Sequence, residues 1–152
     1  MSYEAKLKEM GIVLPAVPKP VAAYVPAAVT GSYVYTAGQV PFVEGKIQFA
    51  GAVGKDLTLD EGAAAARICA LNCLAAIREA VGSLDRIRRI VKLTAFVQSG
   101  PGFFDQPKVV NGASELIGQI FGEAGKHARE AVGVSNLPLN SAVEISVIAE
   151  IG

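Results

Sequence analysis

The sequence predicts an α+β fold, with a mostly antiparallel sheet covered on one face by two helices. An alanine-rich segment after residue 58 and a second segment at 106–121 have helical character, while residues 86–98 and the last quarter of the chain alternate as strands do. Strands therefore precede, separate and follow the two helices. With no internal repeat and no linker in 152 residues, this order indicates one layered domain with a sizeable core.

The first twenty residues are predicted to differ from the rest of the chain. A short amphipathic helix covers about Tyr3 to Met10 and ends at Gly11, and three closely spaced prolines then favour an extended segment. We therefore divide the chain into an N-terminal helix with a proline-rich lead-in, residues 1–20, and a main domain, residues 21–152.

Strand signals open the main domain. Residues 21–30 and 33–37 are rich in β-branched or aromatic residues, and a glycine–serine turn lies between them. A second turn at 44–46 precedes a short strand at 47–50. These segments would form the first strands of the sheet.

The start of the first long helix is the clearest local signal. Thr58 can accept a hydrogen bond from a free backbone N–H while Glu61 reaches back, which forms a capping box. The helix then runs to about Ala80 and ends before Gly82. A glycine-rich loop at 100–102 precedes the second helix, and its spacing does not match a phosphate-binding fingerprint.

The last quarter of the chain is predicted to form a β-hairpin, with two alternating strands joined by a turn around residues 137–140. Alternation assigns Val132 and Val143 to the buried face, and it assigns Arg129 and Glu144 to the opposite face. No segment of the chain covers that second face, whose residues are partly polar and partly apolar. Such a face suits a subunit interface with pockets.

The register of this hairpin separates its two charged residues. A turn centred on Pro138 and Leu139 sets Glu144 opposite Gly133, and Arg129 then lies on the order of 13 Å further along. The two side chains could not serve one small ligand within one subunit. They could converge at an interface between two subunits.

Composition points to a small-molecule function in an oligomer. Hydrophobic residues make up 51% of the chain and charged residues 18%, which favours a subunit with a buried outer surface. The formal net charge is zero, so a dedicated nucleic-acid binder is not expected. No apolar run reaches membrane-spanning length, the N-terminus has no signal-peptide pattern, and a cytoplasmic protein is expected.

Arg129 and Glu144 are the candidate chemical groups. A guanidinium can grip a small carboxylate through two parallel hydrogen bonds, and a carboxyl group nearby can handle a proton or a water molecule. The alternative is that both are ordinary solvated residues. Spacing alone leaves both interpretations open.

The other reactive side chains favour structural interpretations. Cys69 and Cys73 share one helix face and lack further metal ligands, so buried packing is expected and no metal site is predicted. His127 is expected in a loop, where it could orient Arg129 or help a proton transfer. The arginine cluster at 86–89 is too small to indicate RNA binding and favours surface or intersubunit ion pairs.

Four segments resemble the RidA/YjgF family, also called the L-PSP endoribonuclease family: Thr36–Pro41, Ile90–Val97, Ala128–Arg129 and Leu137–Ile145. The likeness is colinear from about Val21 to the C-terminus. It implies a chorismate-mutase-like fold that forms a homotrimer with ligand clefts between subunits. It also implies hydrolysis of reactive 2-imino or enamine acids, such as 2-iminobutanoate and 2-iminopropanoate, to 2-oxo acids and ammonia without a cofactor.

The resemblance also implies residue roles. Arg129 matches the arginine that binds the substrate carboxylate, and Glu144 matches the carboxylate that positions or protonates water. Tyr24, in the expected first strand, and Asn111, on the second helix, match further substrate-binding positions. Two more such positions carry replacements here: Ala37 takes the place of a serine, and Ala131 takes the place of a cysteine.

These departures indicate a divergent branch of the family. Ala37 removes a hydroxyl, while the loss of the cysteine at Ala131 matters little if the backbone makes the contact. Glu130 would compete with a substrate carboxylate if it lay close to Arg129. Three functions therefore stay open: an imine deaminase, a non-catalytic trimer that binds a small carboxylate-bearing metabolite, and, least favoured by the neutral charge, an endoribonuclease.

Overall fold

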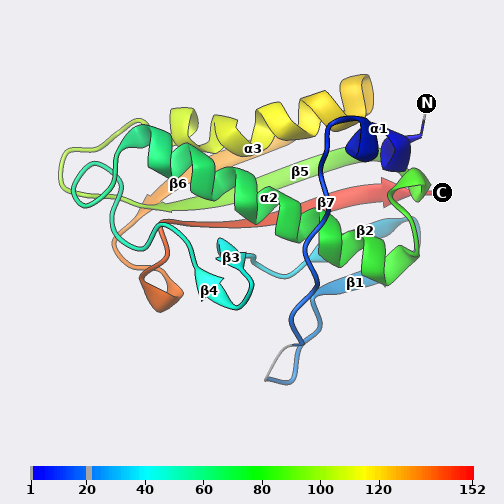
Figure 1. Ribbon diagram of the computed structural model, residues 1–152, viewed down its shortest axis with the longest axis horizontal. Coiled ribbons are helices and arrows are strands. Elements are labelled where there is room, and N and C mark those ends of the chain that lie inside the picture. Colours follow the sequence, from blue (N-terminus) through cyan, green and yellow to red (C-terminus); the bar gives the residue numbers. More distant parts are fainter. Residues whose placement is uncertain (1, 20–21) are drawn as a thin grey trace.

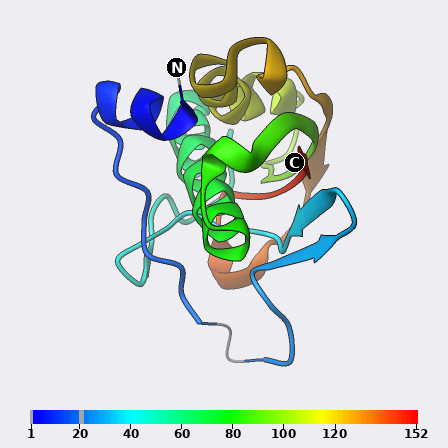
Figure 2. The ribbon, with the colours of Figure 1, turned by 90° about the vertical axis from the view of Figure 1, so that its right-hand side faces the viewer.

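The computed structural model describes residues 2–19 and 22–152. One five-stranded sheet lies against two long helices, α2 (Leu59–Val81) and α3 (Gln106–Phe121), which pack side by side on the same face (Figure 1). Figure 2 shows the helices on one side of the sheet, and none of the described elements lies on the other side. The predicted α+β class, with cover on one face, is confirmed.

The sheet has the order β1-β2-β7-β5-β6, and all neighbouring pairs are antiparallel except β5 with β6. A separate two-stranded hairpin pairs β3 with β4. The first predicted strand is shorter than expected, because pairing begins only at Ala27, and residue 21 lies outside the described residues. The strands are β1 (Ala27–Thr30), β2 (Tyr33–Thr36), β3 (Phe42–Val43), β4 (Lys46–Ile47), β5 (Ile87–Gln98), β6 (Ala128–Val134) and β7 (Val143–Ile151).

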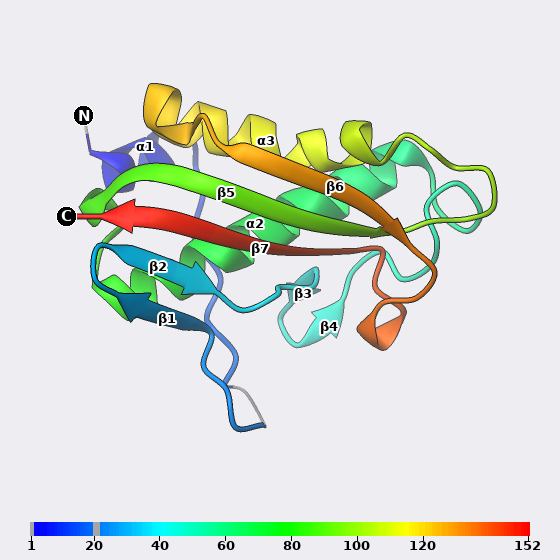
Figure 3. The same cartoon turned by 180° about the vertical axis from the view of Figure 1, so that it is seen from behind.

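The predicted C-terminal hairpin is wrong. β5 lies between β6 and β7, so the last two strands do not pair with each other (Figure 3). α3 provides the long crossover that lets β6 lie parallel to β5. A short 3-10 helix, η3 (Pro138–Asn140), is part of the connection that then takes the chain to the far side of β5.

The predicted faces of β6 are also reversed. In the register with β5, Arg129 lies beside the buried Leu93 and therefore on the helix-covered face, whereas Val132 lies beside Phe96 on the open face. On β7 the prediction holds, because Val143 is buried and Glu144 lies on the open face beside Phe96. The apolar residues of an alternating strand usually face the core. β6 differs because it is an edge strand that the helices only partly cover.

α2 supplies most of the helix side of the core. Its capping box is confirmed: Glu61 N–H donates to Thr58 Oγ1 at 3.1 Å, and Thr58 N–H donates to Glu61 Oε1 at 3.0 Å. Cys69 and Cys73 are fully buried on this helix, where their thiols donate to β7 carbonyl groups. They pack as predicted.

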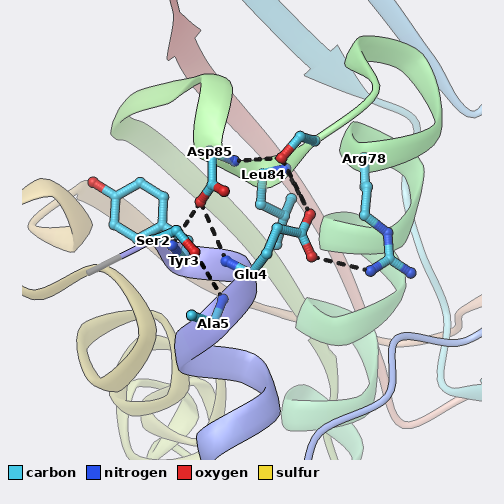
Figure 4. A network of polar contacts seen from close by, with 8 residues as sticks. Ser2, Tyr3, Glu4, Ala5, Arg78, Leu84 and Asp85 are labelled. Carbon is cyan, nitrogen blue, oxygen red and sulfur yellow. Dashed lines mark hydrogen bonds and ion pairs between the residues drawn. The ribbon is translucent and has the colours of Figure 1, made fainter.

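The N-terminal helix α1 (Tyr3–Glu9) is locked to the 3-10 turn η1 (Leu84–Arg86) by two carboxylates that cap each other's element (Figure 4). Asp85 Oδ1 accepts from Tyr3 N–H at 2.6 Å and Glu4 N–H at 3.2 Å. Glu4 in turn accepts from Leu84 N–H and pairs with Arg78. The extended segment after α1 then crosses over α2, and the division at residue 20 stays a prediction (Figure 1).

Candidate functional site

Arg129 lies on the edge strand β6 beside α3, where two helix side chains hold one end of its guanidinium. Its Nη1 donates to Asn111 Oδ1 at 2.8 Å and to Ser114 Oγ at 3.2 Å. Nη1 carries two hydrogens, so both are used. Within the described part of the chain, Nε and Nη2 have no hydrogen-bond partner and remain available to a ligand.

A cavity of about 600 Å³ opens beside this guanidinium. Asn111, a predicted ligand contact, and His127 both lie in its wall. Ala131 follows Arg129 on the same face of β6 and is half-buried against the core, outside the cavity wall. The lining residues are Asn111, Ser114, Gly118, Gly122, Gly125, Lys126, His127 and Arg129.

Two neighbours of this site, Ser114 and Lys126, were not predicted from the sequence. Ser114 follows Asn111 by three residues, so both project from one face of α3. That spacing was the available signal for Ser114. The sequence offered no comparable signal for Lys126, which lies in the turn between α3 and β6.

Glu130 does not compete for Arg129. It points to the open face, where its carboxylate lies 2.9 Å from Lys92 Nζ. The backbone alternation of β6 therefore keeps this extra negative charge on the other side of the sheet from the guanidinium.

Glu144 forms a second, separate group on β7. Its side chain is half-buried on the open face and lies against Gly38, the glycine that follows β2. Burial raises the pKa of this carboxyl above its ordinary value. No ion pair or hydrogen bond to the Glu144 carboxylate is present among residues 2–19 and 22–152, so its charged form lacks compensation in the single subunit.

Tyr24 and Ala37 lie on the Glu144 side of the molecule. Tyr24 is exposed and precedes β1, so its predicted place within the first strand is wrong. It lines a cavity of about 390 Å³ that Gly38 also borders. Ala37 N–H donates to the Pro26 carbonyl at 2.8 Å, and its methyl group stands where the family pattern has a hydroxyl.

The predicted separation of Arg129 and Glu144 within one chain is confirmed, although the predicted register is wrong. Arg129 aligns with Leu93 and Glu144 with Phe96, so β5 lies between them and they occupy opposite faces of the sheet. The chain thus carries two half-sites: the Arg129 half-site (Arg129, Asn111, Ser114) and the Glu144 half-site (Glu144, Gly38, Tyr24). Neither half-site contains both the Arg129 guanidinium and the Glu144 carboxyl group.

The remaining candidate groups are not reactive in this arrangement. Desolvation raises the pKa of Cys69 well above its ordinary value and that of Cys73 to about 12, which disfavours the nucleophilic thiolate. Within the described ranges, no three His, Cys, Asp or Glu side chains gather closely enough to hold a metal ion. In the same ranges, every helix is too short or too polar to cross a membrane.

Comparisons with known proteins agree with this architecture. TCP17 of Trypanosoma cruzi is 45% identical over 148 residues, which covers 97% of this chain and 92% of that protein. The crystal structure of Atu1372 from Agrobacterium tumefaciens, a protein of unknown function, is 46% identical with a TM-score of 0.92 and covers 99% of this chain and 92% of that one. A structure from Shewanella oneidensis MR-1 is 36% identical with a TM-score of 0.95 over 99% and 100% of the two chains.

A family model covers nearly the whole chain. Its description is "YjgF/chorismate mutase-like, putative endoribonuclease", and it matches residues 4–151. The match includes both half-sites and the α2–α3 layer. The chain therefore belongs to the YjgF/chorismate-mutase-like family.

Proposed function

We propose that this protein is a homotrimer that hydrolyses small 2-imino acids to 2-oxo acids and ammonia in clefts between subunits. One observation carries the proposal: each chain holds an anion grip and an uncompensated carboxyl group in two places that cannot serve one small molecule. Two neighbouring copies could supply one half-site each. The family resemblance supplies both the trimer and the reaction.

The open face of the sheet supports the assembly. It mixes apolar side chains with charged ones such as Glu130 and Glu144, and in Figure 3 none of the described elements lies in front of it. Val132, Tyr33 and Tyr35 are each more than 40% exposed there, and Phe96 and Ile148 lie between them. Burying these side chains against other copies would remove apolar surface from water.

The chemistry fits the two half-sites. The free Nε and Nη2 donors of Arg129 suit the substrate carboxylate, since a guanidinium fork can form two parallel hydrogen bonds with it. Water adds to the electrophilic C=N carbon, and ammonia then leaves from the resulting carbinolamine. A carboxyl group with a raised pKa, such as that of Glu144, can take a proton from the attacking water and return it to the leaving nitrogen.

A structure of a more distant protein gives a ligand precedent. Escherichia coli TdcF, crystallised with bound serine, shares this fold at 24% identity with a TM-score of 0.65. Serine carries a carboxylate beside a nitrogen-bearing carbon, as a 2-imino acid does. This likeness supports a small carboxylate-bearing metabolite as the ligand class.

A second candidate is a trimer that binds such a metabolite without turnover. Ala37 favours it, because the methyl group cannot hydrogen-bond to substrate or water at a position where the family pattern has a hydroxyl. In that case Arg129 would still bind the carboxylate. Only the reaction would be lost.

A coupled assay separates the two candidates. Threonine dehydratase or an amino-acid oxidase generates the imine, and its decay is followed with wild type and with Arg129→Ala. Faster decay with wild type, and loss of most of the acceleration in the variant, would support the deaminase. If wild type leaves the decay rate unchanged but binds 2-oxobutanoate, the non-catalytic candidate is correct.

A further inference from the structure

A chain of hydrogen bonds runs through the wall of the Arg129 cavity. His127 Nδ1 lies 2.6 Å from the Gly125 carbonyl oxygen, and its Nε2 lies 3.0 Å from Ser114 Oγ. A carbonyl oxygen only accepts, so Nδ1 carries the proton of the neutral imidazole and Nε2 is left as an acceptor. Ser114 therefore donates its hydroxyl proton to His127.

This direction determines what Ser114 offers to Arg129. A serine hydroxyl has one proton and two lone pairs. With its proton directed at His127, Ser114 Oγ presents a lone pair to Arg129 Nη1, which donates to it at 3.2 Å. The carbonyl of the buried Gly125 thus fixes the imidazole, the imidazole fixes the hydroxyl, and the hydroxyl fixes the guanidinium.

We propose that His127 is a positioning residue for Arg129. Acting through Ser114, it holds the guanidinium so that the Nε–Nη2 edge stays free to take a carboxylate side-on. The second Nη1 hydrogen is donated to Asn111 Oδ1, which lies 2.8 Å from Nη1. Two of the five guanidinium N–H donors are therefore used within the protein, and three remain. The proposal rests on the carboxylate-binding role of Arg129 proposed above.

Preorganisation is the physical benefit. A long arginine side chain on an edge strand loses rotamer freedom when a ligand binds, and this loss weakens binding. A guanidinium that is already held in place has lost that freedom beforehand.

The test compares four variants of the full chain. Ser114→Ala removes the hydroxyl, and Ser114→Thr restores it. His127→Asn keeps an amide that can donate to the Gly125 carbonyl but is too short to reach Ser114. Lys108→Ala, at an exposed lysine of the same helix that pairs with Asp105, is the control.

The first measurement is the affinity for 2-oxobutanoate by calorimetry, with the unfolding temperature measured alongside. Ser114→Ala should weaken binding about tenfold, as expected for the loss of one hydrogen bond to a charged group, and His127→Asn should weaken binding in the same direction by releasing the Ser114 hydroxyl. Ser114→Thr and Lys108→Ala should bind as wild type does. If Ser114→Ala and His127→Asn unfold at a lower temperature but bind 2-oxobutanoate as tightly as wild type, His127 has only a structural role and the proposal is overturned.

The second measurement does not depend on a ligand. The ¹H–¹⁵N heteronuclear NOE at Arg129 Nε reports how rigid this side chain is in the free protein. A rigid Nε in wild type that becomes mobile in Ser114→Ala and His127→Asn supports the proposal, and equal mobility in all three overturns it. If wild type does not bind 2-oxobutanoate, that result counts against the proposed function alone. The NOE at Arg129 still tests whether His127 and Ser114 hold the guanidinium.

Discussion

Gly38 decides where the Glu144 carboxylate can lie. A Cβ at this position would stand 2.9 Å from Glu144 Oε2 and 3.0 Å from Cδ, closer than carbon and these atoms approach in proteins. The atoms involved belong to the end of a flexible side chain, which can rotate away at small cost. Gly38→Ala should therefore move Glu144 and leave the fold intact.

We expect Gly38→Ala to lower imine hydrolysis at least about tenfold, because displacement of an acid–base group by even 1 Å is costly to catalysis. The unfolding free energy should change by less than about 1 kcal/mol, since no backbone atom has to move. Gly45→Ala offers no matched control, because the positive φ of Gly45 adds strain. Gly118→Ala, with open space around its Cβ, serves as a reference for stability only, because Gly118 lines the Arg129 cavity.

The raised pKa of Glu144 makes a second prediction at the residue scale. A carboxyl group with a higher pKa in the folded than in the unfolded state binds more protons when folded, so its contribution to stability is full at low pH and is lost as pH rises through the folded pKa. Glu144→Gln removes this loss. The variant should unfold at a higher temperature than its parent at pH 8, and the difference should vanish near pH 4.

Both proteins in this comparison should carry Arg129→Ala, so that no guanidinium of a neighbouring copy offsets the burial of Glu144. Thermal unfolding from pH 4 to pH 8 gives the result. A variant that is less stable than its parent at pH 8 would show that the folded protein favours the charged carboxylate. Burial would then not be the dominant influence on this group.

At the scale of elements, the sequence predicted the secondary structure of each segment more accurately than it predicted which segments lie side by side. The capping box at Thr58 and the bounds of α3 were correct because both depend on contacts within a few residues. The pairing of β6 was wrong because alternation carries no information on partners, and a short connection favoured a hairpin. Only the crossover through α3 shows that β6 lies beyond β5.

The face of Arg129 was missed for a related reason. Alternation divides β6 into two sets but does not say which set faces the helices. On an edge strand the apolar residues, such as the exposed Val132, can point away from the core and be available for contact with another subunit. The two half-sites were separable from sequence, whereas the cradle formed by Asn111 and Ser114 required the position of α3 against β6.

The contact between α2 and α3 depends on Gly112. A Cβ here would collide with backbone atoms of Ala63 on α2, which cannot move without separating the helices. Gly112→Ala should lower the unfolding free energy by about 2–3 kcal/mol, as overpacking does. Gly118→Ala, on the same helix with open space around it, should raise it by about 1 kcal/mol. Urea unfolding measures both, and equal effects would contradict the close approach of the helices.

At the scale of the whole molecule, the proposed function requires more than one chain, because the two half-sites lie apart within a subunit. Arg129 and Glu144 cannot reach one small ligand within one subunit, because β5 and the plane of the sheet lie between them. If the active cleft lies between copies, each cleft takes Arg129 from one subunit and Glu144 from its neighbour. Variants at the two positions should then complement each other.

Arg129→Ala and Glu144→Gln, each inactive alone, should regain activity when they are co-expressed with different tags and purified as mixed trimers. In a purified mixed trimer one of the three clefts receives an intact arginine from one subunit and an intact carboxylate from its neighbour, so about a third of wild-type activity is expected. Mixing the two purified proteins without subunit exchange is the control and should stay inactive. Mixed trimers as inactive as either parent would mean that one subunit supplies both groups, which the positions of β6 and β7 on either side of β5 argue against.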